Sequence, residues 1–156
     1  MAAVCQSGKM NVGLGAGIDY GGFGGRFTYL PAEKFGLFGA LGYNMESVGF
    51  NGGILYKFIP EKKVTPTISA MYGYNGVIIV KGASEYNGTY YGPSLSAGVE
   101  WKVGNNPKNY WNLELIIPFR SQEFTDDWDA IKDNPDFDVQ NDILPVAFSI
   151  GYHFGF

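Results

Sequence analysis

Apolar side chains recur at every second position along most of this chain, in segments separated by glycine, proline and asparagine. The last segment shows the pattern best. One face carries Leu144, Val146, Phe148, Ile150, Tyr152, Phe154 and Phe156. A period of two is that of a β-strand, whereas an amphipathic helix repeats every 3.6 residues. The pattern therefore predicts a chain built from strands.

Eight such segments can be counted. They cover residues 11–20, 23–29, 35–44, 50–58, 64–75, 90–103, 110–120 and 144–156. Three of the connections, 31–34, 60–63 and 104–108, are short and contain proline, and the others are variable. The longest is 121–142. Eight antiparallel strands without helices favour a closed up-and-down barrel, because closure removes exposed sheet edges. An even strand count places both termini at the end with the short turns.

The length of 156 residues suits a single domain. We expect a flexible N-terminal segment at 1–9 and one barrel at 10–156. The four residues before Cys5 are too few for the apolar core of a signal peptide. If the protein is exported, this sequence is therefore expected to be the mature form.

Which face points outward follows from volume. The chain contains 12 Phe, 11 Tyr and 3 Trp, most of them on the apolar face, while glycine, alanine, serine, threonine and asparagine dominate the other face. The interior of an eight-stranded barrel is just wide enough for side chains or one small ligand. In a soluble ligand-binding barrel the apolar face would point inward, and these large side chains would overfill the interior. The pattern therefore predicts a transmembrane barrel with its apolar face toward lipid.

Aromatic residues gather toward the strand ends, where a membrane barrel carries its interfacial girdles. The expected girdle residues are Tyr20, Phe23, Tyr29, Phe35, Tyr43, Phe50, Phe58, Tyr74, Tyr91, Trp101, Trp111, Tyr152 and Phe154. Strands of about 9–11 residues suffice to cross a bilayer. The predicted strands reach that length.

The opening segment, 11–20, and the final segment, 148–156 (FSIGYHFGF), resemble the small eight-stranded outer-membrane barrels of the OmpA/OmpX type in Gram-negative bacteria. The resemblance implies a bacterial outer-membrane location, with the termini in the periplasm and the longer loops outside the cell. It also implies that outer-membrane lipid and lipopolysaccharide surround the barrel. Tyr152, Phe154 and Phe156 would form the C-terminal signal read by the outer-membrane assembly machinery.

Charged side chains fall on the inward face. They are Asp19, Arg26, Lys57, Glu100, Lys102, Glu114, Arg120 and His153. Charge in a closed interior must be paired or hydrated, so we expect an ion-pair and water network that fills the lumen. If 21–24 forms a four-residue turn, Asp19 lies opposite Arg26. A narrow conduction path is the alternative interpretation of the same residues.

His153 is the only histidine. A serine hydrolase needs its histidine beside a nucleophile, but the inward Ser149 is four positions away on the same strand, roughly 13 Å. No catalytic motif of the lipid-modifying outer-membrane enzymes is present. A net charge of -4 gives no global basic footprint for nucleic acid. No catalytic residue is assigned.

The connection 121–142 holds eight of the chain's 15 acidic residues and a single base, Lys132. Thr125 is predicted to cap a short helix that Pro135 ends. The candidate residues for binding Ca²⁺ or a partner are Phe124, Asp126, Asp127, Trp128, Asp129, Asp133, Asp136, Phe137 and Asp138. Closely spaced carboxylates suit Ca²⁺, although the spacing differs from that of an EF-hand. A Ca²⁺ site, a solvated acidic loop and a partner-contacting loop all remain open, and no metal site is assigned.

Together these features predict a non-enzymatic outer-membrane barrel with a filled polar lumen and no cofactor apart from the Ca²⁺ hypothesis. It would act through its surface loops on another envelope or host protein, or as an accessory subunit of an envelope complex. The alternatives are a small channel and, less favoured by the residues, a lipid-modifying enzyme.

Overall fold

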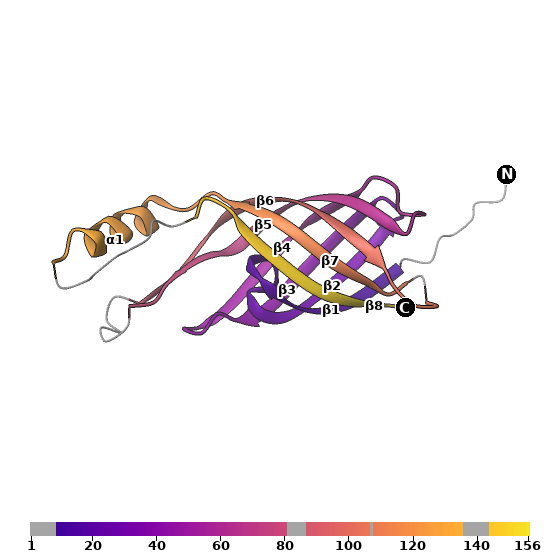
Figure 1. Ribbon diagram of the computed structural model, residues 1–156, viewed down its shortest axis with the longest axis horizontal. Coiled ribbons are helices and arrows are strands. Elements are labelled where there is room, and N and C mark those ends of the chain that lie inside the picture. Colours follow the sequence, from indigo (N-terminus) through magenta and orange to yellow (C-terminus); the bar gives the residue numbers. More distant parts are fainter. Residues whose placement is uncertain (1–8, 81–86, 107, 136–143) are drawn as a thin grey trace.

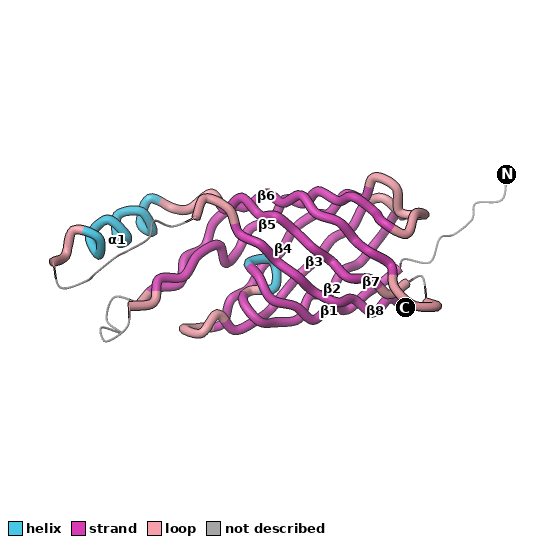
Figure 2. The backbone as a smooth tube through the Cα atoms, in the orientation of Figure 1, coloured by secondary structure: helices cyan, strands magenta, loops and turns pink. Residues whose placement is uncertain are grey.

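A computed structural model describes residues 9–80, 87–106, 108–135 and 144–156. Its eight strands are β1 (Lys9–Gly17), β2 (Gly22–Ala32), β3 (Phe35–Tyr43), β4 (Val48–Lys57), β5 (Val64–Ile78), β6 (Gly88–Lys102), β7 (Tyr110–Pro118) and β8 (Ala147–Gly155). Each strand pairs antiparallel with the next, and β8 returns to pair with β1. The sheet is thus a closed up-and-down barrel (Figures 1 and 2), which confirms the predicted fold class.

The two faces of the barrel differ in polarity, in the direction that the alternation predicts. Large apolar side chains cover the outside and are solvent-accessible in the isolated chain. The exposed fractions of Leu14, Leu41 and Phe50 are 64%, 63% and 52%. Most inward side chains are polar or small, and Thr28 and Asn112 are almost completely buried. A cluster of larger apolar side chains, including Phe38 and Ile116, is buried among them.

The connection between β1 and β2 folds into the barrel. β1 ends at Gly17, and the short 3-10 helix η1 (Ile18–Tyr20) lies buried inside the lumen. Gly21 follows with a φ of 71°, and a Cβ there would lie 2.3 Å from the carbonyl oxygen of Gly49. Only glycine combines this left-handed backbone with such a close approach to a neighbouring strand.

Two predictions for this region are wrong. Tyr20 is fully buried in the lumen and does not belong to an outer girdle. Arg26 pairs in register with Gly13, so residues 21–24 do not form the turn that would set Asp19 opposite it. Asp19 nevertheless reaches Arg26, because η1 carries it back into the lumen. A regular alternation cannot reveal such an inward turn.

β5 and β6, 15 residues each, are longer than the sequence pattern indicates. A register shift between Tyr74 and Gly76 changes the alternation, so that Tyr74 and Asn75 are both buried. The prediction that Tyr74 lies on the outer face is therefore wrong. An extra residue in one strand reorients the side chains around it.

The β5–β6 hairpin and the helix α1 (Gln122–Lys132) extend from the same end of the barrel, opposite the C-terminus and the short turns (Figure 1). Phe124 and Ile131 of α1 form a buried apolar cluster with Ile78 and Tyr90 of the hairpin. We call this unit, α1 and the outer ends of β5 and β6, the projection. No helix in the part of the chain that the structure describes is long and apolar enough to cross a membrane.

The helix begins one turn earlier than predicted. Its N-cap is Ser121, whose side chain accepts a hydrogen bond from the Phe124 backbone N–H, and Thr125 lies inside the first turns. Ser121 captures a backbone N–H that the helix itself leaves without a partner, which explains the earlier start. The helix ends at Lys132, before Pro135, as expected.

Candidate functional site

Three charged side chains meet in the middle of the lumen. Arg26 Nη1 lies 2.8 Å from Asp19 Oδ2 and 3.0 Å from Glu114 Oε1, and all three side chains are almost completely buried. The guanidinium also stacks 3.8 Å from the ring centroid of Phe38. We call Asp19, Arg26 and Glu114 the lumen plug. The plug joins η1, β2 and β7, and thus ties distant parts of the barrel wall together.

Polar neighbours complete the coordination of Glu114. Asn112 Nδ2 donates to Glu114 Oε1 at 2.9 Å, and the Ser96 hydroxyl donates to Glu114 Oε2. Ser96 also shares a hydrogen bond of 2.6 Å with Ser69. The carboxylate therefore accepts several hydrogen bonds besides its contact with Arg26. Such partners are what a charged group needs to remain ionised inside a protein.

His153 is held between two polar side chains. The Tyr20 hydroxyl lies 2.6 Å from Nε2, and Asn11 Oδ1 lies 2.8 Å from Nδ1. An amide oxygen only accepts, so this orientation of Asn11 assigns the proton to Nδ1 and makes Nε2 the acceptor for Tyr20. The imidazole also stacks on Tyr110 at 4.7 Å and 7°. With both ring nitrogens engaged, the arrangement is suited to holding β1, η1 and β8 together rather than to abstracting a proton from a substrate.

A second ion pair lies closer to the end with the short turns. Lys57 Nζ donates to Glu100 Oε2 at 2.7 Å and lies 5.0 Å from the Tyr110 ring centroid. Lys102 Nζ donates to the carbonyl oxygen of Pro60 at that same end. Arg120 lies at the other end, where it donates to the carbonyl oxygen of Leu144 at 2.8 Å.

The structure thus distributes the eight predicted lumen residues over the length of the barrel. Asp19, Arg26 and Glu114 form the plug, Lys57 and Glu100 form a separate pair, and His153 has neutral partners. Lys102 and Arg120 lie at opposite ends of the barrel. Asn11, Tyr110 and Asn112 are not among the residues predicted from the sequence, although the alternation places all three on the inward face. Tyr20 had no such signal.

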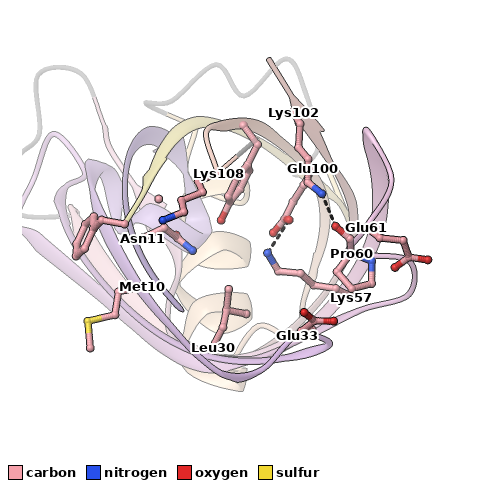
Figure 3. Close-up of a pocket in the computed structure, with 13 residues that line it drawn as sticks. Met10, Asn11, Leu30, Glu33, Lys57, Pro60, Glu61, Glu100, Lys102 and Lys108 are labelled. Atoms are coloured by element: carbon pink, nitrogen blue, oxygen red, sulfur yellow. Dashed lines mark hydrogen bonds and ion pairs between the residues drawn. The ribbon is translucent and has the colours of Figure 1, made fainter. Parts of the chain in front are cut away.

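A cavity of about 420 Å³, the inner vestibule, opens at the end with the short turns and is lined by both apolar and charged residues (Figure 3). Lys57 and Glu100 face each other in its wall, Asn11 and Lys108 line one side, and Glu33 and Glu61 lie on the other side near the turns. Three acidic and three basic side chains line it, so it has no strong net charge.

An apolar cavity of about 270 Å³, the outer vestibule, lies at the opposite end. Its floor includes Ile18 and Tyr74, which belong to a buried cluster with Phe38, Leu55, Met71 and Ile116. Phe38 contacts Arg26. The cluster and the plug therefore lie between the two vestibules, and together they fill the middle of the lumen.

Several residues of the predicted loop site lie on α1. Asp127 accepts a 2.6 Å hydrogen bond from the Tyr90 hydroxyl, while Phe124 is buried and Trp128 packs beside it. The side chains of Asp126, Asp129 and Asp133 are exposed. Asp136, Phe137 and Asp138 lie outside the described residues. Among the described residues, no group of three or more Asp, Glu, His or Cys side chains is placed to hold a metal ion.

The C-terminal aromatic residues line up along β8. Phe154 and Phe156 are exposed, and Tyr152 makes edge contacts with Trp111 at 5.2 Å and Phe154 at 4.8 Å. Trp101 pairs in register with Trp111 and is also exposed. These residues form an aromatic patch on the outer surface, near the end with the short turns.

No protein-family model and no curated protein matches this chain. Among solved structures, the N-terminal β-barrel domain of Pseudomonas aeruginosa OprF is similar, with a TM-score of 0.57 and 13% identity. The match covers 96% of this chain and 100% of that domain. At this identity the likeness shows the fold, and the chain has the eight-stranded barrel architecture of an outer-membrane barrel domain.

Proposed function

We propose that this chain is an integral outer-membrane barrel without enzymatic activity, whose lumen is closed by the plug and whose projection contacts a partner outside the cell. The termini and short turns would then face the periplasm. The proposal combines a structural role for the barrel with a binding role for the projection.

The observation that carries the membrane assignment is the inverted polarity of the barrel. Its outer surface exposes residues such as Leu41, Phe50 and Ile150, while the buried lumen holds Arg26, Glu114 and Lys57. Burying a Leu, Ile or Phe side chain contributes roughly 1.5–3 kcal/mol relative to full exposure to water. In water, a surface this apolar would cause the protein to associate, whereas in a membrane the lipid tails cover it.

The projection supports the binding role. Its apolar residues pack among themselves, which leaves Asp126, Asp129 and Asp133 on its exposed surface. An acidic surface held on a packed helix suits a basic patch of another envelope protein or a host protein. Deletion of residues 124–140 should leave the barrel folded and abolish co-purification of that partner from native membranes. Isothermal titration with Ca²⁺ tests the metal hypothesis for the same loop.

Tryptophan quenching tests the membrane assignment. Trp101 and Trp111 lie on the outer surface of the barrel, whereas Trp128 packs within the projection. In vesicles of phospholipid brominated along its acyl chains, the variants Trp101→Phe and Trp111→Phe should each lose part of the quenching. The matched variant Trp128→Phe should lose none. Equal quenching of the three tryptophans, or none in refolded protein, would contradict the proposal.

A further inference from the structure

We propose that the outer vestibule takes up one acyl chain of a membrane lipid, which enters sideways through a notch in the barrel wall. The inference rests on the proposed membrane location and adds a ligand site to it. Four features of the structure carry it: the gap in strand pairing, the exposure of the rim, the chemistry of the lining and the backbone at Met45.

The notch follows from the strand register. β8 pairs with β7 up to Ala147, but its pairing with β1 stops at Ile150, opposite Ala16. Beyond Ala16, the chain turns into the lumen as η1. Within the described residues, the start of β8 therefore has a strand on one side only. Because β1 ends early, the barrel wall is shorter between the beginning of β8 and the beginning of β2, and we call this gap the notch.

The rim of the notch is apolar and exposed. Phe148, Met45 and Phe23 line the vestibule, and their exposed fractions of 74%, 67% and 66% are among the highest of the large apolar side chains. The same outer surface continues along the barrel through Leu14 and Leu41. A lipid chain that lies against this surface would thus meet the vestibule without crossing a polar barrier.

The lining selects an apolar occupant. None of the residues around the outer vestibule carries a charge, and its polar side-chain groups are the Asn44 amide and the Tyr74 hydroxyl. The Asn44 side chain is engaged, since its Oδ1 accepts hydrogen bonds from the backbone N–H groups of Glu46 and Ser47. Val77 of β5 and Ile79, which follows the strand, also line the vestibule. An ion, a sugar or a lipid headgroup would lose its hydration here without compensation, whereas a hydrocarbon chain would not.

Met45 is held in a backbone conformation that methionine rarely adopts. Its φ of 74° is the only positive value among the non-glycine residues that the structure describes. Such a conformation is unfavourable for a residue with a Cβ, and glycine or asparagine would be the usual choice. The hydrogen bonds to Asn44 hold this turn in place. This turn therefore presents a long, flexible apolar side chain at the rim, where it can adapt to a bound acyl chain.

Photo-crosslinking in vesicles tests the inference. The probe is a phosphatidylcholine with a diazirine near the end of one acyl chain, and labelled residues are located by mass spectrometry. Ile18 and Tyr74, at 8% and 7% exposure, are reached only from inside the vestibule, so we expect label on both. Leu55 and Met71 belong to the same buried cluster but do not line the vestibule, and they should remain unlabelled.

Two variants and one control make the test specific. Val77→Trp fills the vestibule and should lower the labelling of Ile18 and Tyr74 by about tenfold or more, because even one methylene changes the occupancy of an apolar pocket by roughly 10–200-fold. Met45→Asn keeps a residue that accepts the left-handed backbone but removes the apolar rim, and should lower the same labelling. Leu113→Trp, on the lipid-facing surface, should have no effect. Heat-modifiable gel mobility checks that each variant is folded.

The outcomes separate the two proposals. Label confined to outward residues such as Leu113 and Leu115, with none on Ile18 or Tyr74, would overturn the acyl site and leave the membrane assignment intact. Labelling of Ile18 that persists unchanged in a folded Val77→Trp variant would also overturn it. Absence of label from the whole outer surface would refute the membrane assignment, and the acyl site with it.

Discussion

Replacement of Arg26 by methionine tests whether the plug is a stabilising unit. Arg26 is 1% exposed and contacts two buried carboxylates, at 2.8 Å and 3.0 Å. Removal of one partner from a buried ion pair costs about 3–5 kcal/mol, because the remaining charge is left without compensation. Here one substitution leaves both Asp19 and Glu114 without their cation. We therefore expect a loss near the upper end of that range.

The measurement is equilibrium urea unfolding in lipid vesicles, followed by tryptophan fluorescence. The triple variant Asp19→Asn/Arg26→Met/Glu114→Gln removes all three charges, and should recover most of the lost free energy of unfolding. Arg120→Met is the matched control, since Arg120 donates to a backbone carbonyl at the barrel end and has no ion pair in the described structure. That variant should cost about 1 kcal/mol or less.

Two results would contradict this expectation. If Arg26→Met lowers the free energy of unfolding by less than about 1 kcal/mol, the plug contributes no more than an exposed ion pair does. A triple variant no more stable than Arg26→Met would show that charge compensation is not what the plug supplies. Either result would refute the interpretation of Asp19, Arg26 and Glu114 as a mutually dependent set.

In the same urea assay, Gly21→Ala should destabilise the barrel by several kcal/mol more than Gly104→Ala. Both residues have a positive φ, but only a Cβ at Gly21 would meet backbone, at 2.3 Å. Equal losses would show that the inward turn is not tightly packed. Phe124→Ala should speed proteolysis of 121–132 while heat-modifiable mobility of the barrel is retained, because the 4% exposed ring anchors α1; unchanged proteolysis would contradict that role. In planar bilayers, the native protein should show no reproducible ion-selective steps, and such steps would refute the closed lumen.

Much of the architecture was predictable from local pattern. Alternation with a period of two identified the strands, their inward and outward faces and the closed barrel, because a side chain's direction in a regular strand depends only on its position. The inward placement of Glu100, Glu114 and Lys57 follows from the same rule. The pattern worked because volume and polarity demand opposite residue types on the two faces of a small barrel.

The tertiary structure decided what the pattern could not. Tyr20 and Asp19 lie in the lumen because the chain leaves the sheet at Gly17, and Tyr74 is buried because of a register shift in β5. Arg26 meets Glu114 across 88 positions of sequence, which depends on how the closed barrel brings β2 and β7 to the same level. A sequence pattern records the direction of each side chain relative to its own strand. Which side chains meet is set by strand register and by turns that leave the sheet, and these emerge only when the whole barrel closes.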